Sequence, residues 1–279
     1  MSKALTKTVE TKEISEKSNQ ILPDYLIDTK VSNNGLEGLD ATDYKLPRIK
    51  LLQALSPEVK SFPGVARPDT FWHDGANISL GNSFKFVPAL ASKKVALWAP
   101  RASGGKLLAF SSNGVNWDTG GMQKFQVMPK DTKKTVTYFT NKDVRLSNLL
   151  EWGSSDPEDE KSAPAATLIY EYLCHLPDHP GLSPSIFGVY KTAIINAKQL
   201  NTRLLMSRQP SCAQLVECFA EMKFSDKDTW SVPNYRWSGF VDKATYDVAK
   251  EMANSYNNYK PDYTENEPIG KIIEDDIKY

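Results

Sequence analysis

Short apolar runs separated by polar turns dominate the chain between residues 84 and 140. The runs are rich in β-branched and aromatic residues, as half-buried strands are. The turns at residues 104–105, 113–114 and 120–121 hold the glycine and asparagine residues that tight hairpins need for positive φ. The pattern predicts an antiparallel meander with strands at residues 84–90, 95–99, 106–111, 122–128 and 135–140.

Beyond residue 160 the apolar pattern is mixed. Residues 163–176 are apolar on several phases, and we expect a helix because Pro164 suits a first turn, although Tyr170 to Tyr172 would also suit a strand. Helical spacing is clearer at residues 194–205 and at residues 243–256, where Asp242 is a good N-cap. The remaining apolar runs predict strands at residues 186–190, 215–222 and 230–240.

These elements define a β-rich α+β fold. The 17 prolines and 15 glycines indicate many short elements separated by tight turns. We expect an oligonucleotide-binding (OB)-like antiparallel β-barrel core at residues 46–140, an α/β extension packed on it, and a C-terminal helix. Residues 46–259 would form this body, preceded by a disordered N-terminal arm (residues 1–45) and followed by an acidic flexible tail (residues 260–279).

Cysteine content and the N-terminus bear on the compartment. Cys174, Cys212 and Cys218 are odd in number and lack framework spacing, which suits a reducing environment. Residues 1–20 lack the apolar core of a secretory signal, and no apolar run approaches the roughly 20 residues needed to cross a bilayer. We therefore expect a cytoplasmic protein with no membrane partner.

Charge is segregated along the chain, although Lys and Arg total 34 and Asp and Glu also total 34. Residues 46–150 contain 15 basic and six acidic residues, whereas residues 151–259 contain ten and 14. A solvated exterior would mix both signs more evenly. The excess of cations in one third of the chain predicts a polyanionic partner.

Standard catalytic signatures are missing from the sequence. It has no GxxxxGK[ST] loop, no GxGxxG after a strand, no GxSxG and no HExxH motif. The acidic run at residues 156–160 lies in a proline-broken loop, so a solvated loop is favoured over a magnesium site. The cysteines with His175 and His179 match no structural zinc spacing. We expect no catalytic residue, no metal and no cofactor, and therefore not an enzyme.

Cations and aromatic residues alternate along the predicted strands of residues 84–139. Single-stranded nucleic-acid binding needs both, because cations follow the phosphates and flat rings stack on bases at about 1–3 kcal/mol per base. The alternative is that the rings form the barrel core and the lysines its solvated exterior. The expected phosphate contacts are Arg48, Lys50, Lys93, Lys94, Arg101, Lys106 and Lys124, and the expected stacking residues are Trp98, Phe110, Trp117, Phe125 and Tyr138.

The tail that begins at Lys260 carries six acidic residues and ends in an apolar tip. Such a tail can compete for a basic groove on its own domain or recruit partner proteins, and a solubilising terminus is the alternative. The residues expected to bind a partner are Asp275, Asp276, Ile277 and Tyr279.

Several segments of the body resemble a protein family of tailed bacteriophages. They are residues 46–59 (LPRIKLLQALSPEV), 97–101 (LWAPR), 151–159 with 163–168, and 200–204 (LNTRL). The resemblance covers residues 46–259 and implies a phage origin, with the host-cell cytoplasm as the compartment. In layout the chain is similar to phage single-stranded DNA-binding proteins of the OB-fold type.

We expect a sequence-independent single-stranded DNA-binding protein that acts in phage DNA replication or recombination, with other proteins of those processes as possible tail partners. A strand-annealing recombination protein, which would be oligomeric, is one alternative. A virion or interaction protein without a nucleic-acid role is another. The third is an enzyme with a fold-specific site, such as a nuclease using Glu151 and the adjacent acidic loop.

Overall fold

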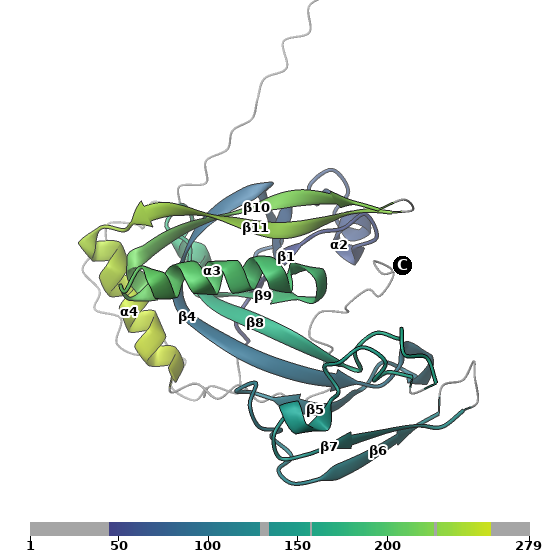
Figure 1. Cartoon of the computed structure of the whole chain (residues 1–279). Helices are drawn as coiled ribbons and strands as arrows, with labels where there is room; N and C mark the ends of the chain where they lie inside the picture. The colour runs from purple at the N-terminus through teal and green to yellow at the C-terminus, as the bar shows by residue number, and fades with distance from the viewer. Residues whose placement is uncertain (1–44, 129–133, 157, 226–227, 258–279) are drawn as a thin grey trace, which may run out of the picture. The chain divides into compact units, whose positions relative to one another are not determined.

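The computed structural model describes residues 45–128, 134–156, 158–225 and 228–257 (Figure 1). All of these residues belong to a unit that spans residues 41–279. The expected arm up to residue 44 and the expected tail at residues 260–279 lie outside the described residues, as do the side chains of Arg101 and Asn257.

Strands outnumber helices throughout the described part of the chain. The strands are β1 (Arg48–Leu51), β2 (Phe71–His73), β3 (Ile78–Gly81), β4 (Ser83–Trp98), β5 (Leu107–Ser111), β6 (Gln123–Val127), β7 (Val136–Thr140), β8 (Ala166–His175), β9 (Ser185–Tyr190), β10 (Gln214–Phe224) and β11 (Thr229–Phe240). The α-helices are α2 (Pro57–Ser61), α3 (Ile194–Met206) and α4 (Lys243–Asn257). Short 3-10 turns are η1 (Arg101–Ser103), η2 (Arg145–Ser147), η3 (Pro180–Leu182), η4 (Lys191–Ala193) and η5 (Ser211–Ala213).

One mixed sheet unites strands from the whole body. Its order is β11-β10-β4-β8-β9-β1-β2-β3, with β5 paired to β4 outside this path, while β6 and β7 form a separate two-stranded sheet. Neighbouring strands are antiparallel except β1 and β9, which run parallel. The expectation of a self-contained barrel at residues 46–140 is therefore wrong, because β8 and β9 separate β4 from β1.

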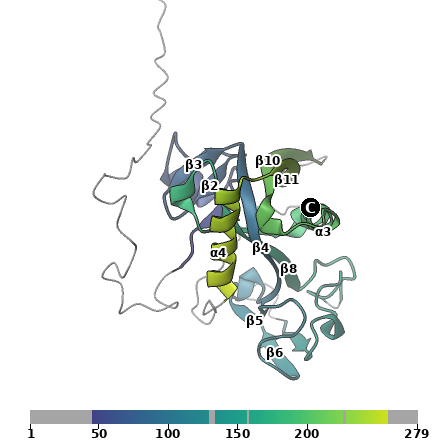
Figure 2. The same cartoon turned by 90° about the vertical axis from the view of Figure 1, so that its left-hand side faces the viewer.

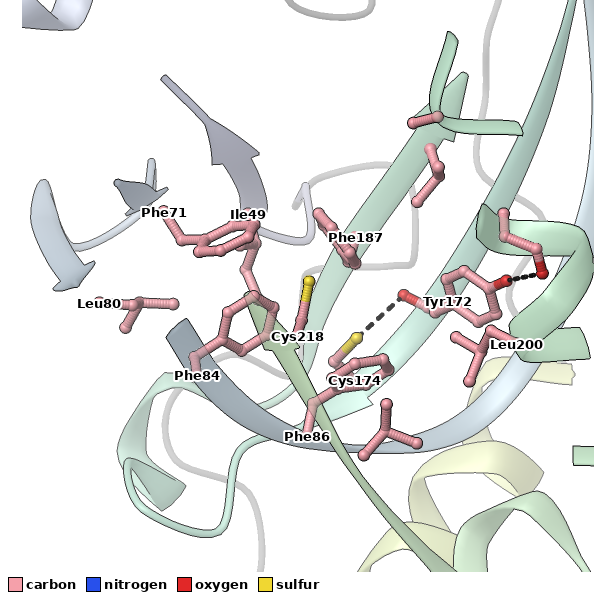
Figure 3. Packing of buried hydrophobic residues seen from close by; sticks show 14 of the residues in the cluster. Ile49, Phe71, Leu80, Phe84, Phe86, Tyr172, Cys174, Phe187, Leu200 and Cys218 are labelled. Carbon is pink, nitrogen blue, oxygen red and sulfur yellow. Dashed lines mark hydrogen bonds between the residues drawn. The ribbon is translucent and has the colours of Figure 1, made fainter. Parts of the chain in front are cut away.

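The sheet curls into a half-barrel, because strands from its two ends share one core. Leu80 on β3 and Val232 on β11 belong to the same hydrophobic cluster although they lie at opposite ends of the strand order. Figure 3 shows Phe71, Phe84 and Phe187 gathered within this cluster, and the rings of Phe71 and Phe84 meet edge-to-face with centroids 4.8 Å apart. Such edge-to-face contacts stabilise the core beyond simple area burial.

The two ends of the curled sheet are tied together by Gln53. Its Nε2 donates to the carbonyl of Ser231 at 2.9 Å, and the N–H of Ser231 donates to Gln53 Oε1 at 3.1 Å. The side-chain amide thus pairs with β11 as the peptide group of a neighbouring strand would. The Ser231 hydroxyl also bonds the carboxylate of Asp69. These bonds satisfy polar groups on β11 that β10 does not reach.

The hairpin of β6 and β7 packs over a second core. Phe125 and Val127 face this core together with Tyr138, their neighbour across the hairpin, and Trp117 lies beneath them. Phe125 is opposite Tyr138 in the register, so both rings point to the same side of the hairpin. The opposite side of the hairpin is exposed at Lys124, Gln126 and Phe139.

Most predicted elements were confirmed, but the predicted meander was wrong. The strands expected at residues 84–90 and 95–99 are one strand, β4, and β5 pairs with β4 while β6 and β7 form a separate sheet. Helices α3 and α4 match the expected ranges, and α4 begins at the expected cap, because the N–H of Thr245 donates to Asp242 Oδ1 at 2.8 Å. The helix expected at residues 163–176 is wrong: this segment is β8, paired to both β4 and β9. A central strand with both faces covered carries apolar residues on both phases, which is why the pattern resembled a helix.

Candidate nucleic-acid interface

Three of the expected phosphate contacts are held by carboxylates of the fold. Glu171 on β8 is buried and accepts from Arg48 Nη2 at 3.2 Å and from Lys94 Nζ. Lys50 Nζ lies 3.1 Å from Glu58 Oε1 and 3.7 Å from Asp74 Oδ2. These ion pairs hold the cations within the fold and speak against the expectation that Arg48, Lys50 and Lys94 contact phosphates.

The Glu171 carboxylate is ionised in the folded protein. Burial alone would raise its pKa, but the charges of Lys94 and Arg48 outweigh burial and lower the pKa below its ordinary value. Arg48 comes from β1, Lys94 from β4 and Glu171 from β8, so the cluster links three strands. Its role is therefore in holding the sheet.

The other expected cations are only partly available. Lys106 and Lys124 are exposed. Lys93 is half-buried, and a Cβ added at Gly114 would lie 2.6 Å from its Cγ, so its stem runs over that glycine. The side chain of Arg101 is not described. Lys93 lies on β4, Lys106 directly before β5 and Lys124 on β6, and their contact with phosphates stays a prediction.

The expected stacking rings belong mostly to the interior. Phe110, Trp117 and Tyr138 are 7%, 2% and 2% exposed, so they offer no open face to a base. Trp98 and Phe125 are half-buried and pack against hydrophobic clusters. The burial of Phe110, Trp117 and Tyr138 speaks against base stacking by these three rings, because both faces of the β5–β4–β8 part of the sheet carry a core. Stacking by Trp98 and Phe125 stays a prediction.

In the folded protein, acidic residues from outside residues 46–150 lie beside cations of that segment. The acidic loop at residues 154–160 lies beside β7: Lys134 forms an ion pair with Glu158, and the Tyr138 hydroxyl donates to the carbonyl of Ser155 at 3.3 Å. Burial raises the pKa of Tyr138, and Asp156 adds to the shift. The excess of cations at residues 46–150 is thus partly neutralised by carboxylates from outside that segment.

A surface that joins α3 to β11 combines cations with open rings. We define the α3–β11 surface as Arg203, Arg208, Trp237 and Phe240. The guanidinium carbon of Arg203 lies 4.8 Å from the ring centroid of Trp237, and the rings of Trp237 and Phe240 meet edge-to-face at 5.4 Å. Trp237 is 38% exposed and Phe240 is 57% exposed. These rings are open to solvent, unlike those predicted.

The chain before β10 carries positive charge without carboxylates. Residues 179–216 contain Lys191, Lys198, Arg203 and Arg208 and no acidic residue. On β11, Arg236 stacks on Phe219 at 5.4 Å and has Glu217 at 3.7 Å. Arg236 therefore lies on the face of the β10–β11 hairpin opposite Trp237, and its side chain is 67% exposed there.

Two buried side-chain contacts fix the geometry of this surface. Asn196 on α3 donates from Nδ2 to the carbonyl of Pro233 at 2.9 Å, which anchors the helix along the edge strand β11 (Figure 1). Gln214, fully buried, lies within hydrogen-bond distance of Leu204 O, Ser207 Oγ and Gln209 O. Gln214 therefore holds the turn that contains Arg208 against the start of β10. Gln214 is itself the residue paired with Phe240 in the β10–β11 register.

A second exposed ring lies on the outer side of the β6–β7 hairpin. Phe139 is 51% exposed and stands directly opposite Lys124. This pair resembles the expected combination of a cation and a ring, and Lys124 is one of the predicted residues. It is a smaller feature than the α3–β11 surface, since one cation accompanies one ring.

The histidines and cysteines do not form a nucleophilic centre among the described residues. The N–H of Ala76 donates to His73 Nδ1 at 3.0 Å, so His73 Nε2 carries the proton and donates to Ser185 Oγ at 3.0 Å. The Ser185 hydroxyl in turn donates to the carbonyl of Leu182. A catalytic pair needs the imidazole to accept the serine proton, which is the reverse direction. Burial also lowers the pKa of His73 and raises the pKa of Cys174 and Cys218.

The sequence did not predict the α3–β11 surface. The overall acidic balance of residues 151–259 conceals the acid-free stretch at residues 179–216. That stretch was visible in the sequence and could have indicated a basic helix. The contact between this basic stretch and the rings of Trp237 and Phe240 depends on how α3 packs against β11. That packing cannot be predicted from any local sequence pattern.

These features define a β-rich protein with a curled half-barrel sheet and few helices, in which no described residues form a cluster of three or more metal-ligating side chains. Within the same residues, no helix has the length and apolar character needed to cross a membrane. The chain belongs to the Pam3 phage gp34-like protein family, whose model matches residues 16–260, which supports the expected phage origin. No curated protein and no solved structure gave a significant match.

Proposed function

We propose that this phage protein binds single-stranded DNA without sequence preference, in the host-cell cytoplasm, during DNA replication or recombination. The curled half-barrel acts as an OB-like scaffold, and the DNA lies on the α3–β11 surface. The observation that carries the proposal is the open Arg203–Trp237–Phe240 arrangement, flanked by cations and by a stretch of chain without carboxylates.

The physical basis is the pairing of stacking with charge. A base stacked on an aromatic ring contributes about 1–3 kcal/mol, and every base offers such a face, so the contact is insensitive to sequence. Arginines beside the rings neutralise phosphates and release counterions. Because Arg203 covers one face of Trp237 and is held there, its charge is positioned before the strand arrives.

Binding of labelled oligo-dT by the full-length protein, measured by fluorescence anisotropy, tests the proposal. We expect Trp237→Ala to weaken affinity about tenfold or more, from the loss of one stacked base. Phe139→Ala is the matched control, because it removes an exposed ring of the β6–β7 hairpin. Unchanged affinity in a Trp237→Ala, Phe240→Ala double variant would contradict the proposal, and loss in Phe139→Ala alone would move the site to the hairpin.

A strand-annealing protein is the second candidate, and one observation favours it. Ile195 and Leu205, which are 67% and 79% exposed, lie on one flank of α3 with Lys198 and Thr202 between them at helical spacing. Exposed apolar residues on a helix flank are typical of self-association sites. Light scattering of the wild-type protein and of Leu205→Glu, with a complementary-strand annealing assay, separates the two candidates.

A further inference from the structure

A groove between α4 and the loop after β8 lies apart from the α3–β11 surface. Its volume is about 390 Å³, and one wall is a stripe of α4 formed by Ala244, Thr245, Val248 and Met252. The facing wall is rich in proline, at Pro177, Pro180 and Pro184. Figure 2 shows α4 standing in front of the sheet. Val248, in the middle of the stripe, is 46% exposed, so an apolar wall is open to solvent.

A histidine without a partner lines this groove. His175, at the end of β8, is 5% exposed, and within the described residues its Nδ1 has no hydrogen-bond partner. Burial lowers its pKa, so the ring is neutral and can both donate and accept one hydrogen bond. A buried polar atom left unpaired costs about 1–3 kcal/mol. Nδ1 itself is shielded from solvent, so the groove suits an apolar occupant that packs against the imidazole ring.

The end of this same chain has that chemistry. Residues 269–279 (IGKIIEDDIKY) contain four isoleucines and finish at Tyr279, whose phenol combines a flat apolar ring with a hydroxyl. The ring suits both the proline wall and the imidazole ring.

The segment is also long enough to reach the groove. Helix α4 ends at Asn257, and 22 residues follow. The distance back along α4 from Asn257 to Val248 is about 14 Å at 1.5 Å per residue, whereas 22 extended residues span up to about 70 Å. We propose that residues 269–279 fold back along α4 of the same chain and place their apolar side chains in this groove, with Tyr279 against His175. A tail held in this way is withdrawn from other proteins until it is released.

Disulfide trapping in the full-length protein tests the contact. Lys278→Cys is combined with Thr245→Cys inside the groove or with Asp247→Cys on the outer side of α4, and rates of disulfide formation are compared. The native thiols are buried and do not compete. We expect the Thr245→Cys pair to close about tenfold or more faster, since docking raises the local concentration of the tail at one side of the helix only.

Two further variants probe the chemistry. Adding Tyr279→Ala or Val248→Glu to the Thr245→Cys pair should bring its rate down to that of the Asp247→Cys pair. Val248 is half exposed, so its substitution leaves the fold intact. Equal rates for the two original pairs would overturn the proposal. A product that links two chains would overturn docking within one chain and assign the groove to the tail of a second copy.

Discussion

Removing the Glu171 carboxylate should lower the stability of the whole sheet. Glu171→Gln keeps the shape of the side chain but removes the negative charge that Arg48 and Lys94 share at the junction of β1, β4 and β8. Breaking a buried ion pair on one side costs about 3–5 kcal/mol. Because Arg48 is 16% exposed and can turn toward water, we expect the lower end, about 3 kcal/mol. For a body of 150–250 residues this corresponds to a fall in Tm of about 6–12 °C.

Urea unfolding followed by circular dichroism measures this loss as a lower midpoint with an unchanged slope. Glu217→Gln is the matched control, because Glu217 is 25% exposed and pairs with Arg236 at 3.7 Å; it should cost less than about 1 kcal/mol. Equal losses in the two variants would refute the assignment of Glu171 as a structural centre.

The difference in unfolding free energy between the wild-type protein and Glu171→Gln should depend on pH in a direction that the structure predicts. The pKa of Glu171 is lowered on folding, so its contribution is fully present above the unfolded pKa of about 4.3 and is lost as the pH falls through the folded pKa. The stability gap between the wild-type protein and Glu171→Gln should therefore be constant near neutral pH and narrow under acid conditions. A gap that widened on acidification would contradict this assignment.

Three other substitutions test separate parts of the structure. Gln53→Ala should cost about 2 kcal/mol in urea unfolding, because it leaves the N–H and carbonyl of Ser231 without their partner across the end of the sheet. Asp242→Ala should lower the midpoint of urea unfolding through loss of the α4 cap. A loss of the same sign should develop in the wild-type protein as acid protonates Asp242, whose pKa is lowered chiefly by the backbone N–H of Thr245. Arg203→Ala should reduce the slope of log affinity for oligo-dT against log salt by about 0.7, the value for one phosphate contact with a single strand; an unchanged slope would remove Arg203 from the interface.

The sequence predicted the local elements well, because their signals are local. The cap at Asp242, the spacing of Ala197, Leu200 and Leu204 in α3, and the glycine turns between β4 and β7 each depend on a few neighbouring residues. Strand β8 was mistaken for a helix because its burial on both faces is a property of the assembled sheet. The strand order could not be predicted either, because it is also a property of the assembled sheet.

The candidate site was harder to predict than the fold, since residue type does not report burial. Trp117 and Tyr138 have the chemistry of stacking residues, but the packing of the β6–β7 hairpin places them in a core. Lys94 has the charge of a phosphate contact, but Glu171 reaches it from a strand far along the chain. Arg203 and Trp237 meet only because α3 packs along β11. In each case the deciding neighbour is distant in sequence.

The position of β1 in the interior of the sheet sets the order in which the chain can assemble. This strand precedes all the others, yet its partners are β2 and β9, and Gln53 just after it awaits β11. During synthesis the first strand must therefore wait for nearly the entire body to emerge before its place exists. Pairings between such remote segments slow folding.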